Sequence, residues 1–126
     1  MPFVKVHVSQ GLELSNQNLI LKQIRNALIQ ILGIKDSHGH LILYESPSMA
    51  REVHESRDIN FVFIEIQMFS GRTDEQKEKL FKKITSIIKA HIAVNENDIL
   101  INIIETERKN WGGRGGIPVS KLDLGY

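Results

Sequence analysis

Pro2 is the residue of this chain whose chemistry depends least on other residues. A proline at a free N-terminus is a secondary amine, and α-amino groups titrate near pH ~7.7–8.0. Burial in an apolar pocket lowers the pKa of such an amine further, because burial disfavours the charged form. An amine tuned near the working pH can take up a proton and return it, as general acid–base catalysis requires. This role requires removal of Met1, since the Pro2 nitrogen is otherwise a tertiary amide.

Arg72 is the second candidate, because it directly precedes Thr73, where we expect a helix to begin. A cation beside a helix N-terminus is mildly unfavourable unless an anion is expected nearby. With the exposed N–H groups of the first helical turn, Arg72 would form a carboxylate site. The alternative is a surface ion pair with Asp74 or Glu75.

The tail from residue 108 to residue 126 is rich in glycine and carries Trp111 and Arg114. Trp111 supplies a large ring and Arg114 a second cation, and the glycines allow either tight turns or close approach to a ligand. We expect this tail to form a hairpin over a site or against a neighbouring subunit. Its one Arg-Gly-Gly sequence is a weak sign of RNA binding, because the tail has neither interleaved aromatic residues nor an excess of basic residues.

His38 and His40 are two residues apart, so both could lie on one face of a strand as metal ligands. No third ligand has a suitable spacing, and we therefore expect no metal site and interpret the pair as a partly exposed strand edge. The sequence also lacks a phosphate-binding glycine loop, a nucleophile elbow and a metalloprotease helix.

Composition restricts the class of protein further. The 126 residues carry a formal net charge of +1 and no cysteine. We expect a single domain over residues 1–126, with neither nucleic acid nor a membrane as partner. The absence of cysteine excludes disulfides and thiolate chemistry. No signal peptide is visible and no apolar run approaches the ~20 residues that span a bilayer, so we expect a cytoplasmic protein.

Hydrophobic periodicity predicts two βαβ units, at about residues 2–45 and 61–105. Residues 46–58 are polar and predict a loop with a short strand. In the second unit, Thr73 and Gln76 have the spacing of a capping box at a helix start. The other expected elements are strands over residues 3–8, 41–45, 61–68 and 99–104, and a first helix over residues 15–32 that ends at Gly33.

The two predicted units agree when they are compared at an offset of 60 residues. The strand Val4–Val8 falls on Ile64–Met68, and the turn residue Gly11 falls on Gly71. The agreement extends through helix and second strand, which favours an internal duplication over shared periodicity alone. Two right-handed βαβ units side by side predict an α+β fold: a four-stranded sheet with both helices on one face, followed by a C-terminal hairpin.

Taken together, these features resemble the tautomerase superfamily, the group similar to 4-oxalocrotonate tautomerase with its MIF-like fold. The resemblance covers the whole chain and rests on Met1-Pro2 before a strand, the duplication, the tail around Trp111, and Gly71-Arg72-Thr73 with the Glu-Gln-Lys that follows. Within the superfamily, the chain is most similar to longer members with fused βαβ units, such as malonate semialdehyde decarboxylase and uncharacterised tautomerase-like proteins.

The resemblance implies a homotrimer in which each site lies near Pro2 and is lined partly by a neighbouring subunit. It implies that Pro2 moves a proton between oxygen and carbon of an enol, or acts protonated as an acid. It further implies that Arg72 binds a substrate carboxylate and polarises the keto oxygen, and that Trp111 forms an aromatic wall. Neither a metal nor an organic cofactor is expected.

Three positions depart from the decarboxylases. Ser70 stands where they have the earlier of two arginines, His38 lies near the position of their aspartate with Asp36 two residues before it, and Gly113 stands where relatives have an aromatic residue. These differences favour simple tautomerisation over decarboxylation or hydration.

The leading hypothesis is therefore an isomerase that interconverts the enol and keto forms of a small 2-keto or 2-hydroxydienoic acid. Fixed positive charge beside a forming enolate is the main electrostatic help that such a site can give. Two alternatives remain open: a decarboxylase or hydratase of a small keto acid that uses the same proline, and a non-catalytic ferredoxin-like binding module.

Overall fold

A computed structural model describes residues 1–125 of the chain. Four strands form one mixed sheet in the order β2-β1-β3-β4. β1 pairs in parallel with β2, β3 pairs in parallel with β4, and the two pairs join through the antiparallel contact of β1 with β3. The strands are β1 (Phe3–Ser9), β2 (His40–Ser46), β3 (Val62–Phe69) and β4 (Ile99–Thr106).

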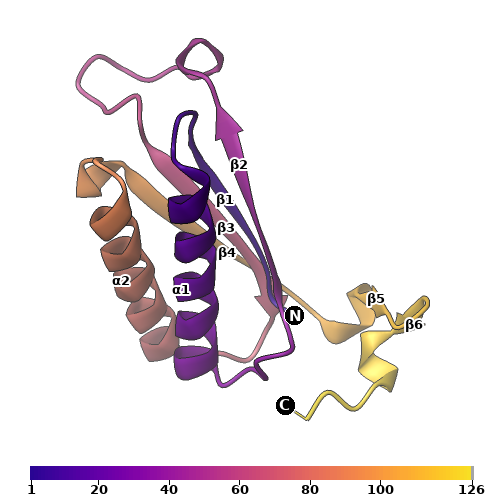
Figure 1. Ribbon diagram of the computed structural model, residues 1–126. Coiled ribbons are helices and arrows are strands. Elements are labelled where there is room, and N and C mark those ends of the chain that lie inside the picture. Colours follow the sequence, from indigo (N-terminus) through magenta and orange to yellow (C-terminus); the bar gives the residue numbers. More distant parts are fainter. Residues whose placement is uncertain (126) are drawn as a thin grey trace.

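Two helices, α1 (Leu14–Leu32) and α2 (Asp74–His91), cover the same face of this sheet (Figure 1). α1 ends at Gly33, whose left-handed backbone (φ 70°) lets its N–H reach the carbonyl of Ile29. α2 begins with the predicted capping box, in which Thr73 and Gln76 each accept a backbone N–H from the other. The predicted α+β fold is confirmed.

The core lies between this face and the helices. Alternate residues of the two central strands point toward the helices and are buried, as the period of two requires. Each helix contributes a buried stripe with helical spacing. Fully inaccessible members of the core include Val4, Val6, Ile20, Ile24, Leu28, Ile64, Ile66, Leu80, Ile84 and Ile88.

The short elements follow the outer strands. A hairpin of β5 (Gly112–Gly113) and β6 (Ile117–Pro118) confirms the prediction for the tail. The prediction of a short strand within residues 46–58 is wrong, because this segment forms the single 3-10 turn Ser48–Ala50. Its polar residues lack the apolar alternation that would hold a strand against a core.

The elements recur at the same offset of 60 residues, and the recurrence extends beyond the predicted units. The 3-10 turn Ser48–Ala50 after β2 matches the turn Arg108–Asn110 after β4.

Among residues 1–125, no helix is long and apolar enough to cross a membrane.

Candidate functional site

Strand directions bring the N-terminus to one end of the sheet. β1 begins there, and because β2 runs parallel to it, His40 at the start of β2 lies beside Phe3. The His40 N–H donates a hydrogen bond to the Pro2 carbonyl at 3.1 Å, and Pro2 is buried. Gly39 adopts a left-handed conformation (φ 84°), and a Cβ at this position would lie 3.3 Å from the Pro2 carbonyl oxygen. Only glycine therefore fits this close approach without strain.

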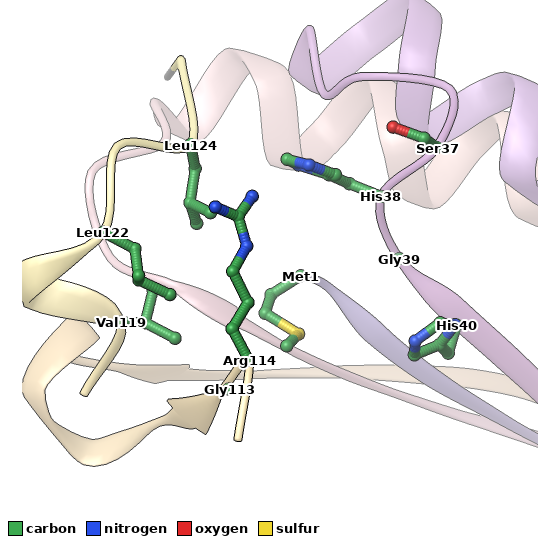
Figure 2. Close-up of a pocket in the computed structure, with 10 residues that line it drawn as sticks. All are labelled: Met1, Ser37, His38, Gly39, His40, Gly113, Arg114, Val119, Leu122 and Leu124. Atoms are coloured by element: carbon green, nitrogen blue, oxygen red, sulfur yellow. The ribbon is translucent and has the colours of Figure 1, made fainter. Parts of the chain in front are cut away.

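A pocket of about 200 Å³ opens at this end of the sheet. The Met1 side chain lies in it, between the turn that carries His38 and His40 and the tail that carries Arg114 and Leu122 (Figure 2). Its lining consists of Met1, Ser37, His38, Gly39, His40, Gly113, Arg114, Val119, Leu122 and Leu124. The pocket thus draws on both halves of the chain.

The apolar wall of the pocket belongs to a second, smaller hydrophobic cluster, separate from the main core. Val119, Leu124 and Phe69 are buried in it, and Met1, Trp111 and Leu122 pack against them. The Trp111 ring meets Phe69 edge-on at a centroid distance of 5.8 Å, and its Nε1–H donates to Thr106 Oγ1. The Trp111 carbonyl accepts the Val119 N–H at 2.9 Å. Trp111 therefore fixes the tail to the end of the sheet.

Positive groups surround the pocket. Burial lowers the pKa of the Met1 ammonium below its usual value. The pKa of His38 is also lowered, first by loss of solvent and then by the positive charges of the N-terminus, Lys35 and Arg114. The lowered pKa of His38 therefore indicates that several positive charges lie close to it. Such an arrangement favours an anionic ligand.

Arg114 has a backbone conformation that its residue type rarely adopts. Its φ of 47° makes it the one non-glycine residue with positive φ in the described part of the chain, and it sits among glycines in the β5–β6 hairpin. Such a conformation costs free energy and tends to occur where function requires it. The guanidinium makes no hydrogen bond or ion pair within residues 1–125 although it borders the pocket. Its side chain extends beside Met1 at the pocket (Figure 2).

Arg25 on α1 holds the turn that faces Pro2. Its Nη1 donates to the carbonyls of Asp36 (3.0 Å) and His38 (2.7 Å), and its Nη2 donates to that of Gly39 (2.7 Å). A planar guanidinium can satisfy three carbonyls in this way, whereas the compact ammonium of a lysine is a point charge. Arg25 thus fixes the backbone of His38 and Gly39 next to the N-terminus.

The remaining predicted site residues lie outside the pocket. Arg72 is half-buried in the loop between β3 and α2, at the same end of the sheet, yet neither it nor Trp111 is among the lining residues in the described chain. His38 and Arg114 line the pocket, whereas Pro2 is buried directly behind Met1 and is not itself among the lining residues. What each residue does toward a substrate stays a prediction.

Sequence reasoning missed several residues that form the site. Arg25 lies on a helix face that the sequence shows only as polar, and nothing in its spacing indicates carbonyls eleven to fourteen residues later. The apolar residues Val119, Leu122 and Leu124 follow Pro118 at short intervals, and this spacing was a signal for a buried tail. The sequence contains no signal that the Met1 side chain lines the pocket.

Comparison with known proteins places the chain in a family. The family model described as tautomerase enzyme matches residues 40–114, and the chain therefore belongs to the tautomerase family. The probable tautomerase YusQ of Bacillus subtilis is 22% identical over 121 residues, 92% of this chain and 95% of the relative. The 2-hydroxymuconate tautomerase of the same organism is 32% identical over 53 residues, 42% of this chain and 86% of the relative. This second relative is about half as long, the size of one βαβ unit.

Solved structures support the fold. The wild-type symmetric trimer of the W0 fused 4-OT has a TM-score of 0.85 at 19% identity and covers 94% of this chain and 98% of its own. FG41 malonate semialdehyde decarboxylase, inhibited by 3-bromopropiolate, has a TM-score of 0.78 at 22% identity, with 90% and 91% covered. The resemblance to longer tautomerase-superfamily members is confirmed.

Replacing Arg25 with alanine should loosen the turn against Pro2. Three carbonyls then lose their donor, so the His40 N–H should exchange with solvent at least about tenfold faster, a loss of about 1.4 kcal/mol of local protection. Amide hydrogen exchange by NMR measures this, with the exposed Lys22→Ala on the same helix as control. Unchanged exchange at His40 in Arg25→Ala would contradict the positioning role.

Proposed function

We propose that the chain is a cofactor-independent tautomerase that interconverts the enol and keto forms of a small 2-keto or 2-hydroxydienoic acid, with Pro2 as general acid and base once Met1 is removed. The observation that carries the proposal is the placement of Met1. Its side chain lies in a pocket lined by apolar residues and cations, directly before the buried Pro2. Removal of Met1 leaves the secondary amine of Pro2 facing that space.

The chemistry follows from the charges around the pocket. In its neutral form the Pro2 nitrogen takes the proton from the enol hydroxyl, and as an ammonium it returns that proton to the carbon that becomes saturated. Negative charge grows on the oxygen during the first step, and nearby cations stabilise it. The apolar wall with Leu122 and Leu124 accommodates the carbon chain. Burial disfavours the charged form of an amine, so this environment favours the neutral Pro2 that accepts the proton.

Two arginines have different proposed roles. Arg72, at the start of α2, holds the substrate carboxylate and the developing enolate, in agreement with the family pattern. Arg114 is the second cation and draws the anion into the pocket that it borders. Ser70 and His38, which differ from the decarboxylase pattern, support tautomerisation over decarboxylation or hydration. Membership of an enzyme family favours catalysis over a binding module.

The chain is further proposed to work as a homotrimer, assembled through the sheet face that the helices leave open. Ile42, Tyr44 and Ile104 are each more than a third exposed on this face. Beside them the His7 ring stacks against Tyr44 at 5.3 Å and pairs with Glu65 at 2.7 Å. A partly apolar sheet face of this kind gains stability when a second copy covers it.

The N-terminal amine is tested by comparing two forms of the protein, one beginning at Met1 and one released by a protease to begin at Pro2. The form that begins at Pro2 should ketonise phenylenolpyruvate about 10²–10⁴ times faster, the usual contribution of a positioned acid or base. Its kcat/KM should rise with pH through the pKa of Pro2, because the base must be neutral. Absorbance follows the reaction, and equal rates for the two forms would refute the mechanism.

The arginines are tested in the same assay with Arg72→Gln, Arg114→Gln and, as control, Lys82→Gln on the exposed side of α2. Loss of the enolate-binding charge should lower kcat about 10²-fold in Arg72→Gln. Loss of the anion-attracting charge should raise KM about tenfold in Arg114→Gln with a smaller effect on kcat. Wild-type kinetics in Arg72→Gln would remove it from the site.

The trimer is tested by light scattering of Tyr44→Glu. A carboxylate on the open face would be buried without a partner in the assembly, so this variant should have the mass of one chain where the wild type has that of three. The matched control is Leu19→Glu, since Leu19 is equally exposed, at 42%, on α1. A wild-type mass of one chain, or a trimeric Tyr44→Glu, would contradict the proposed interface.

A further inference from the structure

A second pocket, of about 350 Å³, lies at the opposite end of the sheet. It is formed where the segment after β2 meets the starts of β3 and β4, near the loop drawn farthest from the N-terminus in Figure 1. Its lining consists of Glu52, Val53, Arg57, Phe61, Val62, Phe63, Asn97, Asp98 and Leu100.

The second pocket corresponds to the first at the offset of 60 residues. Among the lining residues, Phe61 occupies the place of Met1, Asp98 that of His38, Leu100 that of His40 and Val53 that of Gly113. Val62, which also lines the second pocket, corresponds to Pro2, which lies directly behind Met1. The antiparallel contact between β1 and β3 explains this relation. Because the two halves run in opposite directions, the same part of each half lies at opposite ends of the sheet. The first pocket combines the start of β2 with the segment after β4. The second pocket combines the start of β4 with the segment after β2.

The supporting contacts recur as well. Arg51 stands in the place of Trp111, and its Nε donates to Ser46 Oγ at 2.8 Å, as Trp111 Nε1 donates to Thr106 Oγ1. The Arg51 guanidinium lies 4.0 Å from the centre of the Phe61 ring. The second pocket is thus built and braced in the same way as the first, which argues that it is a formed cavity and not a gap between loops.

Its chemistry, however, is different. Val62 lies within the chain, so its nitrogen is an amide without acid–base function. His38 of the first pocket is replaced by Asp98, which pairs with Arg57 at 2.7 Å and is nearly buried. Residues 52–58 and 95–98 contain five carboxylates and one arginine, whereas the matching residues 112–118 and 35–38 contain one carboxylate, one arginine and one lysine. The sign of the local charge is inverted.

One charged group of the second pocket is available to a ligand. The Glu52 carboxylate lines the pocket and makes no hydrogen bond or ion pair within the described residues, whereas Asp98 is already neutralised by Arg57. Apolar side chains of Val53, Phe61 and Leu100 line the pocket together with Glu52, and a ligand gains free energy by covering them. Because Arg51 already occupies one face of the Phe61 ring, that face is closed to a second cation.

We propose that this second pocket binds a small primary ammonium compound with an aryl or alkyl body, and that it rejects the carboxylates for which the first pocket is suited. The ammonium donates a charge-assisted hydrogen bond to Glu52. The hydrocarbon body covers Val53, Phe61 and Leu100. With one such bond and a shallow apolar wall, a dissociation constant on the order of 1 mM is expected for a compound of this size.

The test uses the protein in its native assembly, with labelled valine and leucine methyl groups observed by NMR. Phenethylamine and 3-phenylpropionate have the same hydrocarbon body and opposite charge. Phenethylamine should shift the methyl signals of Val53 and Leu100 and leave those of Val119 and Leu122 in the first pocket unchanged, whereas 3-phenylpropionate should leave Val53 and Leu100 unchanged. Equal shifts of the Leu100 methyl signals with both compounds would overturn the proposal. So would the absence of a shift with phenethylamine at concentrations up to about ten times the expected dissociation constant.

Glu52→Gln identifies the group that binds the ammonium, and Glu55→Gln is the matched control, since Glu55 is exposed on the same loop outside the pocket. The first variant should weaken phenethylamine binding about tenfold and the second should not. Equal weakening by both would show a diffuse charge effect and overturn the role of Glu52. Phenylenolpyruvate turnover reports on the first pocket alone, so this result is independent of the fate of the tautomerase proposal.

Discussion

The antiparallel pairing of β1 with β3 is the contact on which the rest of the molecule depends. It joins two βαβ units into one sheet and places both helices on the same face, so that a single core forms between them. It also places the start of β1 beside the end of β3, with Phe3 opposite Gln67. The chain that continues from the neighbouring β4 can therefore fold back over the N-terminus.

This arrangement makes each end of the sheet a meeting point of the two halves. At one end, the turn before β2 and the glycine-rich tail enclose Met1 and Pro2; at the other, the turn before β4 and the loop after β2 enclose Phe61 and Val62. The halves have diverged in charge at these two positions while keeping the same backbone. The repeated fold thus provides two pockets of similar build and different charge.

Much of the fold was predictable from particular residues. Val4, Val6 and Val8 alternate, and Thr73 and Gln76 set the start of α2, because these signals are local and act within a few residues. The segment 46–58 was predicted less well. Its conformation depends on hydrogen bonds to residues outside the segment, from Arg51 to the Phe61 carbonyl and from the Asp58 N–H to the Asp98 carboxylate, which no local pattern records.

The sequence by itself determined the chemical groups: a proline at position 2, a helix preceded by Arg72, and a tail with one arginine among glycines. The sequence also determined the repeat, because the spacing of hydrophobic residues and the offset of 60 between the two units can be read from the order of the amino acids. Only the tertiary structure decided that Arg114 and His38 border the N-terminus, that Arg25 supports the turn between them, and that a second pocket exists. These relations join residues more than ten positions apart, and they depend on strand pairing and on tertiary hydrogen bonds, which local spacing does not record.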